Sequence, residues 1–152
     1  MIKCRLIITL AMCWIAVAAC SQSPVVFAGS TPCAAASPPL PGIPVNTPCE
    51  LIRWELTLYS DTFSLRCAYG LPQQGATGLT GGGTKLILHG KWTAEKGVVP
   101  YRNAVIYRLT DAATNKEIAF WKVNDKVLHL LDAGGRLMVG SAAWSYTLNR
   151  IK

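Results

Sequence analysis

Apolar and polar residues alternate with a period of two over much of the chain after residue 50, and this period is typical of half-buried β-strands. The segment 51–58 has this pattern, and so has 62–69, with Ser60 and Asp61 between them. If Ser60 and Asp61 form a turn, apolar residues face one another at 58 and 63, 56 and 65, 54 and 67, and 52 and 69. The sequence therefore predicts a β-hairpin with this register.

Five later segments also carry strand signals: residues 85–92, 104–109, 118–123, 127–131 and 144–148. Turn signals lie between the later ones, at Thr114-Asn115, Asn124-Asp125 and Gly134-Gly135. Seven strands joined by short connections predict an all-β fold, a small antiparallel meander closed or nearly closed into a barrel. Because side chains fill the interior of such a small barrel, we expect no large ligand cavity.

Residues 1–19 have the features of an export signal. Lys3 and Arg5 precede an apolar run, residues 6–19, and the chain becomes polar at Ser21. This arrangement predicts that the mature chain leaves the cytoplasm.

Val17-Ala18-Ala19 is followed directly by Cys20, and this looks like the lipobox of bacterial lipoproteins. The resemblance implies cleavage before Cys20, a covalent lipid on its sulfur and acylation of the new amino terminus, for example by palmitate. An ordinary signal peptide cleaved at another small-residue site is the alternative. Several acyl chains hold a protein on a bilayer almost permanently, at about 0.8 kcal/mol per buried methylene. Since Ser21 is not acidic, we expect the outer membrane, with the domain facing the periplasm.

Residues 20–48 are rich in proline and carry no charged side chain. Such a composition disfavours a helix and favours an extended spacer, which at about 3.1 Å per residue reaches some 85 Å. The sequence therefore predicts three parts: the signal peptide 1–19, a lipidated tether 20–48 and a barrel domain 49–152. The alternative is that part of the tether, 40–45, packs along the domain as an irregular strand.

Composition excludes several classes of protein. The chain has 152 residues, of which 15% are charged, and about 104 residues from Cys49 onward make one domain. After residue 20, no apolar stretch approaches the roughly 20 residues of a membrane-spanning helix. Multi-domain enzymes, integral membrane proteins and coiled coils are excluded.

The basic charge is mild and scattered. The net charge of +7 falls to +5 when Lys3 and Arg5 leave with the export signal, because 13 basic and 8 acidic residues then remain. A nucleic-acid-binding surface gathers its basic residues on one face or stripe. We therefore expect no nucleic-acid partner.

Residues suited to catalysis or metal binding are not grouped along the sequence. His89 belongs to the outward set of its strand and His129 lies in a short apolar segment, and neither has a carboxylate or second histidine at metal-ligand spacing. There is no G-x-S-x-G or H-E-x-x-H motif and no pair of acids with a local reason to differ in pKa. The run Gly81–Lys85 lacks the order of a phosphate-binding loop and precedes a strand. We therefore expect no enzyme and assign no metal ligands.

Three cysteines lie beyond the export segment: Cys33, Cys49 and Cys67. Cys67 lies on the apolar face of its strand, where a cysteine acts as a small buried hydrophobic residue. It faces Trp54, five residues from Cys49, and a span of about 17 Å argues against a bridge between Cys49 and Cys67. Cys33 can reach Cys49 from the tether, and an oxidising envelope permits that disulfide. Cys33 and Cys49 are thus candidates for a disulfide or for free thiols.

Several short motifs, taken in order, resemble the N-terminal barrel domain of the NlpE-type copper-resistance lipoproteins. They are the lipobox, Pro48-Cys49, Tyr69-Gly70, Gly90-Lys91-Trp92, Leu128–Asp132 with Gly135 after it, and Tyr146–Arg150. The resemblance covers residues 48–152 and implies a lipocalin-like β-barrel on the outer membrane, with a role in envelope-stress or surface sensing and in copper tolerance. The family's Cys-x-x-Cys is here Cys49-Glu50-Leu51-Ile52, and a lone thiolate does not make a two-sulfur copper(I) site.

Three functional hypotheses follow. The leading one is a non-catalytic envelope lipoprotein that contacts envelope proteins through Gly70–Gly83 and the outward side chains of Arg53, Arg66, His89 and Lys91. The second is a carrier of a small apolar molecule at the barrel mouth, between Trp54, Trp92, Trp121 and Trp144, unless these are core residues. The third is copper binding through Cys33, Cys49 and a histidine. Apart from the lipid on Cys20, the sequence indicates no cofactor.

Overall fold

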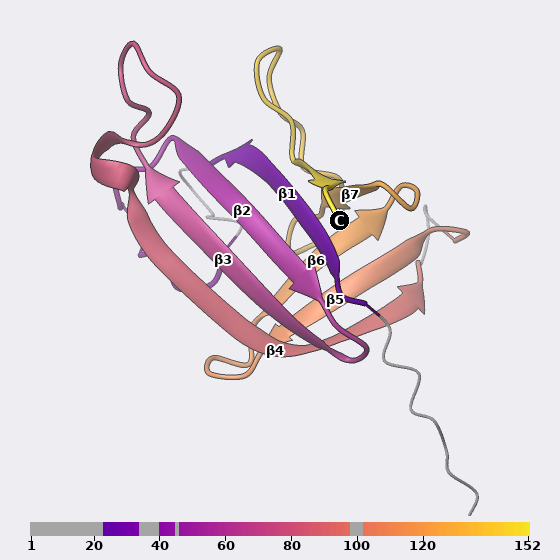
Figure 1. Ribbon diagram of the computed structural model, residues 1–152. Helices are drawn as coiled ribbons and strands as arrows, with labels where there is room; N and C mark the ends of the chain where they lie inside the picture. The colour runs from indigo at the N-terminus through magenta and orange to yellow at the C-terminus, as the bar shows by residue number, and fades with distance from the viewer. Residues whose placement is uncertain (1–22, 34–39, 45, 98–101) are drawn as a thin grey trace, which may run out of the picture.

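The alternating segments form antiparallel strands that close into a barrel. The computed structural model describes residues 23–33, 40–44, 46–97 and 102–152, and its strands follow one another around the barrel in chain order (Figure 1). They are β1 (Val25–Pro32), β2 (Leu51–Leu58), β3 (Thr62–Gly70), β4 (Thr84–Lys96), β5 (Val105–Asp111), β6 (Glu117–Lys122), β7 (Val127–Leu130) and β8 (Thr147–Arg150). One 3₁₀ turn, η1 (Thr80–Gly82), precedes β4. The pairing of β1 with β8 closes the barrel, and the expected all-β meander barrel is confirmed.

The β2–β3 hairpin has the register that the sequence predicts. Its cross-strand pairs include Leu58 with Phe63, Leu56 with Leu65, Trp54 with Cys67, and Ile52 with Tyr69. The Tyr59 N–H donates to the Thr62 carbonyl at 2.9 Å, so Ser60 and Asp61 are the central residues of the turn. Burial of every second side chain therefore sets the register in this hairpin.

Apolar side chains fill the barrel interior. Phe120 is the largest of the fully buried residues, and leucines from five strands belong to the same buried cluster: Leu56, Leu65, Leu109, Leu128, Leu130 and Leu148. Burying one such side chain contributes about 1.5–3 kcal/mol relative to leaving it exposed. The interior thus serves as the hydrophobic core of the domain.

The predicted tether is wrong where the structure describes it, because β1 is a barrel strand. Pro24 and Pro32 lie at the ends of the segment 25–31 rather than inside it, and Val25, Val26 and Phe27 favour a strand. β1 pairs with β2 along its whole length. The barrel therefore begins at Val25 rather than at Cys49.

A weak hydrophobic pattern hides β1 in the sequence. Its inward positions include Gly29 and Thr31, which do not mark an apolar face. A Cβ on Gly29 would lie 2.6 Å from the Thr147 carbonyl oxygen, so the close approach of β1 to β8 needs a glycine there.

Two further boundaries differ from expectation. Leu40 and Ile43 are buried, so this part of the predicted tether packs against the domain, as the alternative expected. It does so in a turn rather than in a strand, and residue 45 lies outside the described residues. The last strand was expected at 144–148 and is Thr147–Arg150. Trp144 instead lies in a small turn, where the Ser141 N–H donates to its carbonyl at 2.8 Å.

The antiparallel order gives the barrel two different ends. The N-terminal end comprises residues 23–26, 58–62, 95–97, 102–106, 121–128 and 149–152. The loop end comprises residues 31–33, 40–44, 46–52, 69–84, 111–117 and 130–147. Figure 1 shows the long connections before β4 and between β7 and β8 projecting from the loop end. No helix within the described ranges has the length and apolarity to cross a bilayer.

Candidate functional site

A pocket of about 270 Å³ opens at the N-terminal end of the barrel. Its lining combines apolar, aromatic and charged side chains from six strands and their turns: Ser23, Val25, Phe27, Leu58, Tyr59, Ser60, Trp92, Tyr107, Lys122, Asp125 and Arg150. Pockets for drug-sized ligands have volumes of roughly 300–1,000 Å³. This pocket therefore fits a small group, such as a headgroup, better than a whole lipid.

Two aromatic rings form one wall of the pocket. The ring centroids of Trp92 and Tyr107 lie 4.9 Å apart at an interplanar angle of 55°. The Trp92 indole N–H donates to the Tyr59 carbonyl at 3.0 Å, which fixes β4 to the β2–β3 turn. The wall is thus held by a hydrogen bond as well as by packing.

Lys122 and Asp125 form an ion pair at the pocket rim. The Lys122 Nζ lies 2.6 Å from the Asp125 Oδ1 across the β6–β7 turn. The hydrogen bond from Lys122 lowers the pKa of Asp125, and the same bond raises the pKa of Lys122. At neutral pH both groups are charged, and Arg150 adds a further positive charge to the lining.

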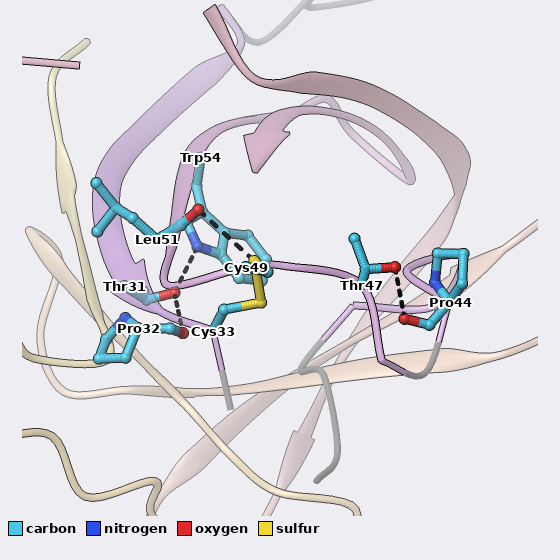
Figure 2. Close-up of a disulfide and its surroundings, with 8 residues drawn as sticks. All are labelled: Thr31, Pro32, Cys33, Pro44, Thr47, Cys49, Leu51 and Trp54. Atoms are coloured by element: carbon cyan, nitrogen blue, oxygen red, sulfur yellow. Dashed lines mark hydrogen bonds between the residues drawn. A yellow bond between two sulfur atoms is a disulfide. The ribbon is translucent and has the colours of Figure 1, made fainter. Parts of the chain in front are cut away.

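At the loop end, Cys33 and Cys49 form a disulfide with a Cα–Cα distance of 5.6 Å. Of the two states that the sequence permits for these cysteines, a disulfide or free thiols, the structure has the disulfide. Figure 2 shows the bridge beside Trp54, whose indole N–H donates to the Thr31 hydroxyl at 2.8 Å. The bridge joins the end of β1 to the residues before β2, and the Cys33 N–H donates to the Glu50 carbonyl at 3.0 Å.

In this form neither cysteine offers a thiolate to a soft metal ion. Within the described residues, no three or more His, Cys, Asp or Glu side chains are grouped as metal ligands. Cys67 is the free cysteine of the described set, and burial raises the pKa of its thiol far above the ordinary value. A buried thiol of this kind is a poor nucleophile and a poor ligand.

The predicted outer surface does form one face, on the outside of β2, β3 and β4. Arg53 lies opposite Ala68, Arg66 opposite Ile87, His89 opposite Ser64, and Lys91 opposite Thr62. Arg66 forms an ion pair with Glu55. The loop Gly70–Gly83 is continuous with this face at the loop end.

The four tryptophans do not gather at one barrel mouth, and that part of the carrier hypothesis is wrong. Trp54 is buried near the disulfide, and Trp92 lines the pocket at the opposite end. Trp121 pairs with His129 between β6 and β7, and Trp144 is exposed in the β7–β8 connection. The His129 Nε2 lies 2.9 Å from the Met138 carbonyl, in a structural contact.

Sequence reasoning missed most of the pocket. Lys122 alternates with the buried residues Ile118 and Phe120, so a lysine at the inward position of a strand end was an available signal. Phe27 lies in the unexpected first strand, and Arg150 lies beyond the expected last strand. These two could be placed only once the strand bounds were known.

Cys20 lies outside the described residues. No family model, curated protein or solved structure matches the chain. The resemblance to the NlpE-type lipoproteins therefore stays a prediction.

Proposed function

We propose that the protein is a non-catalytic lipoprotein of the bacterial envelope, anchored through Cys20 to the outer membrane and facing the periplasm. Its barrel presents the loop end to an envelope protein, in stress or surface sensing or in copper tolerance. The exposed apolar side chains on the two projecting loops carry this proposal. Val139 is 88% exposed, and Trp144 and Leu71 are 43% and 44% exposed.

Exposed apolar side chains on projecting loops are typical of protein-binding sites. The core is filled by side chains, so the barrel suits a rigid support better than a container. At the loop end, the disulfide cross-links Cys33 to Cys49, and Leu40 is buried in the core. A rigid support lowers the entropy lost when loops bind a partner.

Site-specific photo-crosslinking in cells tests the protein-binding proposal. A photoreactive residue at Val139 should give a discrete crosslinked product, and the same residue at Thr93 on the outside of β4 should not. The substitution Trp144→Ala should reduce the product formed from position 139 by roughly tenfold, as the loss of an aromatic anchor does. Equal products from positions 139 and 93 would count against the proposal.

The lipid anchor is tested separately. Growth with an alkyne analogue of palmitate should label the wild-type protein, and Cys20→Ser should remove the label and prevent cleavage of the export signal. Mass spectrometry of the purified protein should find acyl chains on residue 20. An unmodified sulfur at Cys20 would remove the anchor from the proposal.

A second candidate function is supported by the pocket at the N-terminal end. The rings of Trp92 and Tyr107 beside Lys122 and Arg150 suit a small amphipathic or anionic molecule. Native mass spectrometry of the purified protein should then show a stoichiometric small ligand that Tyr107→Ala removes. A protein that is free of ligand in both forms would contradict this carrier function.

Copper binding is the weakest of the three hypotheses, because the disulfide occupies both candidate thiols. Titration of the oxidised protein with copper(I) should show no tight binding. Binding by the oxidised protein that Cys49→Ala abolishes would restore the copper hypothesis.

A further inference from the structure

The position of β1 limits how far the barrel can lie from a lipid on Cys20. The first strand begins at Val25, five residues after Cys20. Five residues span at most about 18 Å even when fully extended. If Cys20 carries the lipid, as proposed above, the N-terminal end of the barrel is held at the membrane surface.

Charge separates the two ends of the barrel. The N-terminal end carries six basic and three acidic residues. The basic residues are Lys96, Arg102, Lys122, Lys126, Arg150 and Lys152. The loop end carries two basic residues, Lys116 and Arg136, and four acidic residues. An anionic bilayer would therefore attract the N-terminal end and repel the loop end.

Apolar side chains are exposed among these basic residues. Of the eight large hydrophobic side chains that are exposed in the described residues, four lie at the N-terminal end: Tyr59, Val105, Val123 and Ile151. Ile151 is 64% exposed beside Lys152. Apolar and tyrosine side chains mixed with lysine and arginine are typical of surfaces that enter the headgroup region of a bilayer.

We propose that the N-terminal end of the barrel docks directly on the surface of an anionic phospholipid bilayer. Tyr59, Val123 and Ile151 enter the headgroup region, and the pocket beside Lys122 and Arg150 opens toward the phosphates. The lipid on Cys20 holds the barrel at the surface, and this second contact sets its orientation. The two projecting loops then point away from the membrane, where a periplasmic protein can reach them.

Amide hydrogen exchange on vesicles tests the orientation. The purified lipidated protein is reconstituted on vesicles of phosphatidylcholine alone and on vesicles with equal parts of phosphatidylcholine and phosphatidylglycerol. On the anionic vesicles, exchange in the turns 59–62 and 123–127 should slow by roughly tenfold, while exchange in 139–144 stays unchanged. High salt should reverse part of the slowing.

Two double variants with the same change of charge serve as test and control. Lys126→Glu with Lys152→Glu alters exposed side chains at the N-terminal end and should remove the slowing. Arg53→Glu with Lys85→Glu alters exposed side chains on the outer wall and should keep it. Neither pair touches the barrel interior, so both variants should fold.

The outcomes separate this inference from the anchor on which it rests. Flotation of the protein with neutral vesicles reports the lipid on Cys20, and its absence would overturn the anchor. Flotation without slowed exchange at the N-terminal end would overturn the docking alone. Equal loss of protection in both double variants, or protection that depends on protein concentration rather than on lipid charge, would also overturn it.

Discussion

The hydrogen bond between Trp54 and Thr31 ties the first strand to the core. Thr31 is almost fully buried and accepts the indole N–H at 2.8 Å. Thr31→Val keeps the shape of the side chain and leaves a buried donor without a partner, at a cost of about 1–3 kcal/mol. Urea unfolding followed by tryptophan fluorescence measures this loss. Thr93→Val on the exposed outside of β4 is the matched control and should change stability by less than about 0.5 kcal/mol.

Gly90 lies in β4 at a point where the β5 backbone leaves no room for a side chain. A Cβ at this position would collide with the Thr110 carbonyl oxygen and contact the Phe63 ring at 3.0 Å. Gly90→Ala should therefore lower the free energy of unfolding by about 1–3 kcal/mol or more. The control is Gly134→Ala, because a Cβ there meets only side-chain atoms at 3.2 Å or beyond. Equal unfolding midpoints for the two variants would contradict this account of Gly90.

The ion pair at the pocket rim predicts a specific titration. Lys122 lowers the pKa of Asp125, so Lys122→Met should raise the pKa of Asp125 toward its ordinary value of 3.8. NMR titration of the carboxyl carbons measures this change. Asp132 is the control, since the Arg136 and Gly134 backbone N–H groups and the Arg136 side chain lower its pKa instead.

The pH dependence of stability follows from these shifts. The lowered pKa of Asp125 stabilises the fold above about pH 3.8, and this contribution is lost as the pH falls through the folded-state pKa. The raised pKa of Lys122 stabilises the fold below 10.5, and this contribution is lost as the pH rises through the folded-state pKa. The pair therefore contributes between these limits, and only weakly, because Asp125 is exposed.

At the scale of elements, strand prediction succeeded where alternation was strong. β2 and β3 have a large apolar residue at every second position, so a shift of one residue would expose all of them. β1 has glycine and threonine at inward positions, and its flanking prolines look like a spacer. Val25, Val26 and Phe27 favour a strand, but the rest of β1 does not, and its pairing depends on the free edges that β2 and β8 offer.

The pocket could not be predicted either, because it too depends on contacts between residues that are distant in the sequence. Its lining comes from strands that are distant in the sequence, and Arg150 reaches it only because β8 closes the barrel against β1. Lys122 was predictable as an unusual inward residue, but not its partner Asp125, which depends on the shape of the β6–β7 turn. The outer face with Arg53 and His89 needed only the strand period and was predicted.

The disulfide joins two elements that are separated by 16 positions in the sequence. A bridge that closes a loop of this size contributes about 3 kcal/mol in the chain-entropy model. Reduction should therefore lower the urea midpoint, and the double variant Cys33→Ser with Cys49→Ser should match the reduced wild type. The double variant should be insensitive to reductant. A wild-type midpoint that stays constant while two thiols appear would contradict a stabilising role for the bridge.

At the scale of the whole molecule, the barrel differs from an open sheet because each strand edge is covered. β1 supplies the edges that β2 and β8 need, and the disulfide fixes its end. Without β1, two strand edges would be exposed, together with the inward faces of Trp54 and Leu148. Exposed edges of this kind promote aggregation.

Two truncated chains test whether β1 is a strand or a spacer. A chain that begins at Ser23 keeps all eight strands that the structure describes, and we expect cooperative unfolding and a β-type dichroism spectrum. A chain that begins at Cys49 would be the complete domain if 20–48 were a tether, but it lacks β1 and the partner of the disulfide. It should expose apolar surface, bind a hydrophobic dye and aggregate, because closure requires the edges of β2 and β8 to be paired.

Adding a peptide of residues 23–33 should restore part of the native signal if β1 acts by filling that gap, whereas a peptide with Phe27→Asp should not. Cooperative folding of the chain that begins at Cys49 would show instead that the barrel closes without its first strand.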